Sequence, residues 1–204
     1  MNIDNLVCPT CGAPVKLKNR FVKVAVCDYC GQTLVVQDDK LDPTGKTAKM
    51  TDYPTPFKIG RFGRLKGDEF EVIGMVRYEY DEGFWDEWCL NMGGDKLVWI
   101  EEDEGLFRSF ERVRIKSAIQ SWEEVYPGST ITINNIDIFI TEKNSAKILG
   151  AVGNLTVKRV PGTTLKYLDG TGDEKQFTIE FYENSINLKA GEDLDRADFT
   201  FKED

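Results

Sequence analysis

The chain contains no histidine, and this absence excludes several common kinds of catalytic site. Ser-His-Asp triads, Cys-His dyads and zinc hydrolases with histidine ligands all require an imidazole. An enzyme made from this chain would have to rely on carboxylates, lysine, tyrosine or cysteine. No set of these residues in the sequence is typical of a catalytic site, so we expect a protein that is not an enzyme.

Long apolar runs and an excess of positive charge are also missing. No stretch of about 18 apolar residues is present, so we expect no insertion into a membrane. The first residues, MNIDNLVCPTCG, lack the basic start and apolar core of a secretory signal. The formal net charge is −9 and the pI is about 4.8, which makes nucleic acid an unlikely partner because its backbone demands positive charge. These features predict a cytoplasmic protein.

Four of the five cysteines form two C-x-x-C pairs, Cys8 with Cys11 and Cys27 with Cys30, separated by fifteen residues. A glycine follows each pair and relieves the tight turn that brings two thiolates toward one ion. Four thiolates at this spacing are typical of a tetrahedral structural zinc site with no open coordination position. A rubredoxin-like iron site uses similar pairs but usually a longer gap. The spacing therefore predicts a zinc ribbon.

The charge and the proline content divide the chain into three parts. Residues 1–37 form the predicted ribbon, and residues 38–56 contain three prolines and little periodicity, as in an exposed linker. Residues 57–204 carry 19 basic and 29 acidic side chains, whereas residues 1–56 carry seven and six. The net charges of −10 and +1 support a domain boundary at residues 53–56.

The acidic part of the chain is predicted to be all-β. Residues 70–80 alternate with a period of two, and Gly-bearing turns near residues 83 and 94 join this strand to two more in an antiparallel meander. Further alternating runs follow, with one short helix expected at residues 117–126. The pattern predicts one or two small antiparallel barrels, and the faint likeness of residues 57–126 to residues 127–204 would fit a duplicated unit without requiring one. In a late strand, Glu180 alternates with apolar neighbours, so we expect it on an exposed outer face.

The first meander concentrates negative charge. Residues 79–104 contain ten acidic side chains and one basic one, a net charge equal to that of the whole protein. Within it, Trp85 and Glu87 share one face of a strand, and Asp86 and Trp88 share the other. Two tryptophans flanking a groove beside carboxylates would suit a cation. The alternative is that one tryptophan belongs to the core, the other packs under the linker, and the acids are solvated.

A second acidic run, Glu101, Glu102, Asp103 and Glu104, lies at a strand end and turn. These side chains could bind a hard cation, although the spacing is not that of an EF-hand, or they could dock a basic partner. Solvated carboxylates at a turn are the simpler interpretation.

Several segments together resemble a known family. They are the CPTCG and CDYCG ribbon, FEVIGMVRYEYDEGFWDEWCL (residues 70–90), LVWIEEDEG (residues 97–105), AVGNL (residues 151–155) and FTIEFYEN (residues 177–184). With them the chain resembles the bacterial domain-of-unknown-function 4178 family, carrying an N-terminal zinc ribbon. The resemblance implies a cytoplasmic protein without an assigned reaction, associated with membrane-stress, phage-shock-like or polyamine-related systems.

Three functional hypotheses follow. The first is a non-catalytic adaptor whose acidic, Trp-rich sheet docks a basic protein partner. The second is a binding module for a small cation or polyamine, and the third is a carboxylate-based hydrolase. The adaptor hypothesis leads because no residue set is typical of catalysis, and because the closed metal site offers no reactive position.

Overall fold

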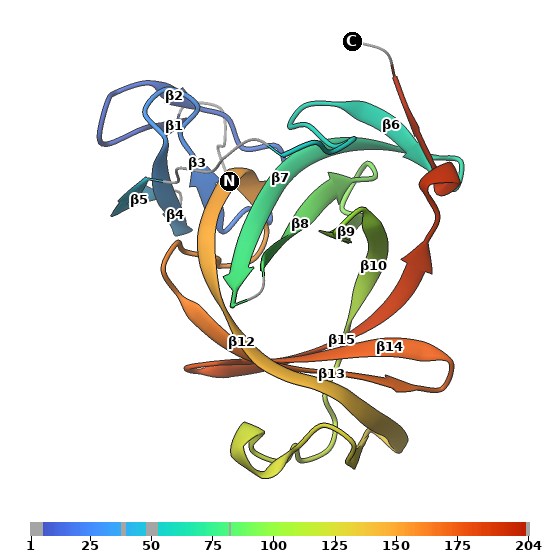
Figure 1. Cartoon of the computed structure of the whole chain (residues 1–204). Helices are drawn as coiled ribbons and strands as arrows, with labels where there is room; N and C mark the ends of the chain where they lie inside the picture. The colour runs from blue at the N-terminus through green and yellow to red at the C-terminus, as the bar shows by residue number, and fades with distance from the viewer. Residues whose placement is uncertain (1–5, 38–39, 48–52, 82, 203–204) are drawn as a thin grey trace.

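The computed structural model describes residues 6–37, 40–47, 53–81 and 83–202, and nearly all of its regular structure is β-strand (Figure 1). The N-terminal strands are β1 (Leu6–Val7), β2 (Pro14–Val15), β3 (Val24–Val26), β4 (Gln32–Gln37) and β5 (Lys40–Thr47). The next are β6 (Phe62–Leu65), β7 (Asp68–Tyr80), β8 (Gly83–Asn91), β9 (Leu97–Asp103) and β10 (Leu106–Val113). The last are β11 (Thr130–Ile133), β12 (Ile136–Leu155), β13 (Thr164–Gly172), β14 (Lys175–Tyr182), β15 (Ser185–Leu194) and β16 (Phe199–Phe201). Among the described residues, no helix has the length and apolar character needed to span a bilayer.

Within the described part of the chain, eight strands close into one barrel. The hydrogen-bonded order is β7-β8-β9-β10-β15-β14-β13-β12, and β12 pairs back onto β7. The all-β prediction is confirmed. Of the two predicted alternatives, one barrel or two, the described residues form one. Each half contributes a four-strand meander to the barrel. The first strand of each meander also forms a hairpin with the strand before it, β6 with β7 in one half and β11 with β12 in the other. The first strands of the two halves pair with each other, and so do the last strands, as a pseudo-two-fold arrangement requires.

The barrel closes where β7 and β12 approach each other at glycines. A Cβ atom on Gly74 would lie 2.2 Å from the backbone carbonyl oxygen of Asn154. Gly153 has a φ of +72°, and a Cβ atom there would lie 2.3 Å from the carbonyl oxygen of Ile73. Close approach of the backbones requires glycine at both positions, and the positive φ adds a second reason at Gly153, so these glycines permit the closing seam.

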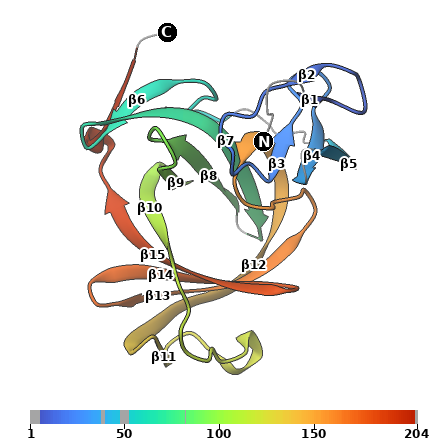
Figure 2. The ribbon, with the colours of Figure 1, turned by 180° about the vertical axis from the view of Figure 1, so that it is seen from behind.

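Apolar side chains pack on the outside of the barrel beneath two covers, and the inside combines charged residues with an aromatic and apolar cluster. On one half, Phe70, Trp88 and Ile100 pack outward against a cover formed by Phe57, β6 and β16. On the other half, the outer face of β12–β15 packs against β11 and the segment that follows β10. Figures 1 and 2 show these covers lying against opposite sides of the barrel. Since side chains alternate along a strand, the remaining residues of each barrel strand face the lumen. They include an aromatic cluster around Tyr78, Trp85 and Tyr167 as well as charged side chains.

The ribbon is joined to the barrel by direct strand pairing. Strands β3 and β4 form a hairpin, and β3 also pairs with the end of β12, with Val24 opposite Leu155. Strand β5 pairs with β4, so part of the expected linker belongs to the ribbon. Short β-prone stretches containing proline give little periodicity, which explains why the sequence pattern missed β5. The rest of the expected linker includes residues 38–39 and 48–52, which lie outside the described residues.

The prediction of a helix at residues 117–126 is wrong. Only Trp122–Glu124 form a single 3₁₀ turn there. Ile119, Trp122 and Val125 all pack against the outer face of the second half. Their spacing of three residues matches the three-residue turn of a 3₁₀ helix better than the 3.6-residue turn of an α-helix.

Candidate functional site

The four cysteines of the ribbon come together in one cluster. The Sγ atoms of Cys8, Cys11, Cys27 and Cys30 all lie within 4.8 Å of one another. The Cys8–Cys30 distance is 3.8 Å and the Cys11–Cys27 distance is 3.7 Å, far longer than the S–S bond of about 2 Å in a disulfide. In each turn the glycine after the second cysteine donates its N–H to the first cysteine's carbonyl oxygen, at 2.8 Å. The cluster can therefore hold a metal ion.

A set of buried ion pairs crosses the barrel lumen. Lys189 on β15 contacts Glu87 on β8 at 2.6 Å and Glu180 on β14 at 2.7 Å. Arg159, from the segment after β12, contacts Glu180 at 3.0 Å and donates to the hydroxyl oxygen of Tyr78 at 2.8 Å. We call Lys189, Glu87, Glu180 and Arg159 the charged belt. Burial alone would raise the pKa of Glu180, but Lys189 and Arg159 outweigh it and lower the pKa.

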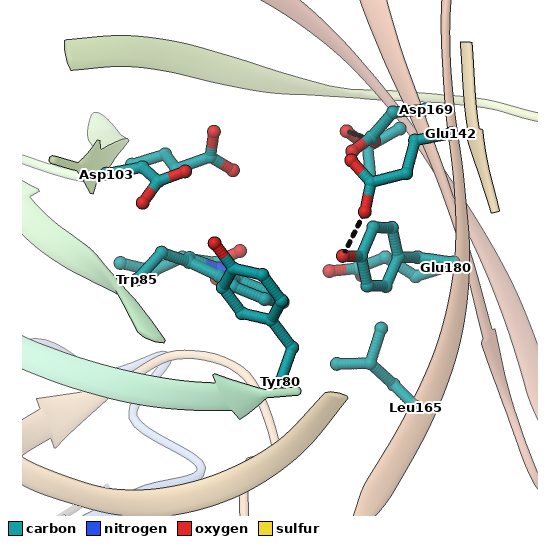
Figure 3. A pocket seen from close by; sticks show the side chains of 11 residues that line it. Tyr80, Trp85, Asp103, Glu142, Leu165, Asp169 and Glu180 are labelled. Carbon is teal, nitrogen blue, oxygen red and sulfur yellow. Dashed lines mark hydrogen bonds between the residues drawn. The ribbon is translucent and has the colours of Figure 1, made fainter. Parts of the chain in front are cut away.

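On one side of the belt lies a cavity of about 180 Å³ that we call the acid chamber. This volume has room for on the order of ten water molecules. Its described lining comprises six carboxylates, three aromatic side chains, one threonine and one leucine: Glu87, Glu101, Asp103, Glu142, Asp169, Glu180, Tyr80, Trp85, Tyr167, Thr178 and Leu165. Asp103 projects from one wall toward Glu142 and Asp169 on the other (Figure 3). The lining contains no cationic side chain among the described residues.

The acid chamber holds carboxyl groups that resist ionisation. Burial, helped by the neighbouring carboxylates of Asp169 and Glu87, raises the pKa of Glu101 to about 8 against the opposing effects of Arg108 and Lys189. Burial likewise raises the pKa of Asp169 to about 6, although the hydroxyl of Thr178 donates to it at 2.6 Å. Crowded carboxyl groups in a low-dielectric cavity are costly to ionise without a nearby positive charge.

Two polar atoms in the chamber walls lack protein partners. Asp103 Oδ1 and Trp85 Nε1 are buried and make no hydrogen bond among the described residues. The Trp85 ring stacks on Tyr78, with centroids 4.9 Å apart and an interplanar angle of 9°, and meets the edge of Tyr167. These contacts hold the indole in place. The chamber therefore presents an oriented ring to a ligand, while the two unpartnered polar atoms lie buried within its walls.

The predicted ligand residues are divided among three cavities and a core. One of these cavities, of about 340 Å³, is lined by Glu101 and Asp103 beside Arg108 and Asp193. Trp85, Glu87, Glu101 and Asp103 line the acid chamber. Asp86, Glu102, Asp103 and Glu104 line a neighbouring pocket of about 110 Å³ outside the lumen, beside Tyr53, Tyr80 and Phe84. Trp88 lies in the outer core, stacked on Phe57, and its indole N–H donates to Glu102 at 2.8 Å.

The expected solvation of these acids is wrong for three of them. Asp86, Glu87 and Glu102 are buried. Asp86 accepts two hydrogen bonds from Arg77 at 2.7 Å each. The predicted split of Trp85 and Glu87 from Asp86 and Trp88 across the two faces of a strand is confirmed.

The residues that form the opposite wall of the acid chamber were not identified from the sequence. Tyr80, Glu142, Tyr167, Asp169 and Thr178 were not among the predicted site residues, and Glu180 was expected on an exposed face. Glu180 is instead 2% exposed. The available signal was the run of polar side chains on one parity of β13 and β14. A period of two separates two faces, but it does not distinguish a lumen from bulk solvent.

These features define a closed β-barrel with a charged lumen, joined to a four-cysteine ribbon. The family model of the domain of unknown function DUF4178 matches residues 58–196, so the chain belongs to that family. Comparisons with curated proteins and with solved structures gave no match.

Proposed function

We propose that the protein is a binding module for a small organic cation with more than one ammonium group, held in the acid chamber. The observation that carries this proposal is a cavity lined by six carboxylates and three aromatic rings. Glu87, Glu180 and Glu101 have cationic partners, whereas Asp103, Glu142 and Asp169 have no ion pair among the described residues and lack that compensating charge. A bound polyamine would supply that charge and allow the buried carboxyl groups to ionise. The ring faces of Tyr80, Trp85 and Tyr167 would add cation–π attraction along the methylene chain.

An extended organic cation suits the chamber better than a single metal ion does. In the described parts of the chain, the one cluster of metal-ligating side chains close enough to surround an ion is the cysteine cluster. The chamber's carboxylates are spread over both walls instead (Figure 3). A chain with separated ammonium groups can meet such carboxylates in turn, whereas a hard metal ion needs them converging at about 2 to 2.6 Å.

The adaptor hypothesis accounts less well for the same residues. Docking a basic protein requires accessible carboxylates, and Asp86, Glu87 and Glu102 are each less than 10% exposed. Glu104 is exposed and could still contribute to a surface. The hydrolase hypothesis stays a prediction, because carboxylates do face each other across the chamber.

The test is a thermal-shift and calorimetric titration with spermidine. We expect spermidine to raise the melting temperature, because a ligand that binds only the folded state stabilises it by mass action. The Glu101→Gln, Asp169→Asn double variant should lose most of this shift. Glu111→Gln, an exposed carboxylate on β10 outside the chamber, should keep it.

An acidic protein can be stabilised by any cation through charge screening, so MgCl₂ and NaCl at equal ionic strength provide the comparison. The proposal would be contradicted if MgCl₂ raised the melting temperature as much as spermidine does, or if the double variant kept the full spermidine effect.

We further propose that the ion in the ribbon is zinc and that its role is structural. Tetrahedral zinc with Zn–S bonds of about 2.3 Å places its sulfurs about 3.8 Å apart, which agrees with the 3.7 and 3.8 Å separations. Thiolates of this kind persist in a reducing compartment, which favours the cytoplasm. Elemental analysis of the purified protein should find one zinc per chain.

A further inference from the structure

A second cavity lies on the other side of the charged belt. It measures about 160 Å³, and its lining comprises Glu87, Trp99, Phe110, Arg112, Val157, Arg159, Glu180, Asn187 and Lys189. We call it the basic chamber. It shares only Glu87 and Glu180 with the acid chamber, so the belt separates two compartments of different chemistry.

The hydrogen-bond acceptors of the basic chamber are already occupied. Glu180 accepts from Lys189 at one oxygen, and from Arg159 and Asn187 at the other. Glu87 accepts from Lys189 at one oxygen and from Tyr78 at the other. The amide oxygen of Asn187 accepts from Arg112 at 2.7 Å. Each side-chain oxygen of these three residues therefore has a donor.

Donors, in contrast, remain available. The ammonium of Lys189 has three N–H groups and directs two of them to Glu87 and Glu180. Arg112 is exposed at the chamber, and its one side-chain partner among the described residues is the neutral Asn187. The lining carries three cations and two carboxylates, an excess of one positive charge. A ligand that satisfies this chamber must bring acceptors and a single negative charge.

We propose that the basic chamber binds the carboxylate group of a small organic acid. Arg112 supplies the main charged contact, because a guanidinium matches a carboxylate with two parallel N–H donors. Trp99, Phe110 and Val157 form the apolar part of the lining and receive the body of the acid. A monovalent carboxylate fits the single excess charge, whereas inorganic phosphate at neutral pH is a mixture of singly and doubly charged ions and presents a tetrahedral rather than a planar set of acceptors. This site does not depend on the acid chamber's ligand.

The test is an NMR titration of the zinc-loaded full chain with three probes: propionate, propionamide and inorganic phosphate. We expect propionate to bind, with propionamide and phosphate each weaker by about tenfold or more, because the charged pair is lost or mismatched. Arg112→Gln should weaken propionate binding by a similar factor. The control is Arg114→Gln, an exposed arginine two residues further on that does not line the chamber.

Several outcomes would overturn the assignment. They are equal affinity for propionate and propionamide, stronger binding of phosphate than of propionate, and unchanged propionate binding in Arg112→Gln. The Glu101→Gln, Asp169→Asn variant should retain propionate binding. Loss of the spermidine effect with retention of propionate binding would show that the two chambers act separately.

Discussion

At the scale of single residues, Lys189 balances two buried carboxylates. Its side chain is 14% exposed, and those of Glu87 and Glu180 are 6% and 3% exposed. Lys189→Met would leave both carboxylates with less compensation, so we expect a loss of about 3 to 5 kcal/mol in the free energy of unfolding, measured in urea. Lys166→Met is the matched control, because its ion pair with Glu123 is exposed and surface pairs of this kind contribute little to stability. Equal losses in the two variants would contradict this account.

Glu101 should make stability depend on pH. Its pKa is about 8 in the folded protein, against an ordinary value of 4.5. The folded chain therefore binds this proton more tightly, and stability falls as pH rises from 4.5 to 8, with the full contribution present only below that range. Relative to Glu101→Gln, the wild type should lose up to about 1.4 kcal/mol per pH unit in this window. Urea unfolding of both proteins at pH 5 to 8 measures this, and a constant difference between them would refute it.

Residue-level expectations succeeded where a period of two was enough. It placed Trp85 and Glu87 opposite Asp86 and Trp88, and the C-x-x-C spacing identified the cysteine cluster. The period of two failed to place Glu180, because a polar strand face has the same sequence pattern whether it faces solvent or a closed lumen. Only the long-range pairing of β7 with β12 decides that.

At the scale of elements, the β7–β12 seam should be the place most sensitive to small changes. Gly74→Ala would put a methyl carbon 2.2 Å from the carbonyl oxygen of Asn154. The strands would have to separate, and we expect a loss of at least about 2 kcal/mol in the free energy of unfolding. Gly83→Ala is the control, since the nearest atom to its Cβ would be 3.6 Å away, on Tyr80. Unfolding curves of similar midpoint for the two variants would rule out the seam's importance.

Local elements were more predictable than their assembly. The turns near Gly83 and Gly94 predicted the hairpins of the first meander, and these are present. The number of barrels could not be predicted, because closure depends on pairing between residues about 70 positions apart in sequence, such as Arg77 and Gly150. Strand β5 was missed because proline and glycine interrupt its pattern, although its backbone pairs with β4.

At the scale of the whole molecule, the net charge has an unexpected location. Part of the negative charge in residues 79–104 lies in the interior, with Asp86, Glu87 and Glu102 buried and Glu101 lining the lumen. A surface docking patch and an internal ligand site therefore predict different salt responses. Exposed charges are screened at physiological ionic strength, whereas buried charges are screened much less. A spermidine affinity that survives 0.3 M salt would favour the lumen.

The ribbon and the barrel share a sheet, yet they should unfold separately. The ribbon has its own apolar cluster around Val22, Leu34 and Leu41, and its stability depends on bound metal if the cysteine cluster is a structural zinc site. Cys27→Ser should abolish zinc retention and expose the amides of β3 and β4 to hydrogen exchange.

The barrel should remain protected in this variant, because its own eight-strand ladder closes without β3. Hydrogen exchange read by mass spectrometry resolves the two regions. The control is Cys89→Ala, which changes a buried cysteine of β8 away from the cluster, and this variant should retain zinc. If the barrel amides of the Cys27→Ser variant lost protection together with those of the ribbon, the β3–β12 pairing would make the two parts one cooperative unit. The strand pairing joins two residue pairs, and Val24 and Val26 also pack in a buried cluster with barrel residues such as Val76 and Leu155. Because the closing ladder of the barrel does not include these contacts, we expect them to orient the ribbon and to add to the stability of the barrel without determining whether it folds.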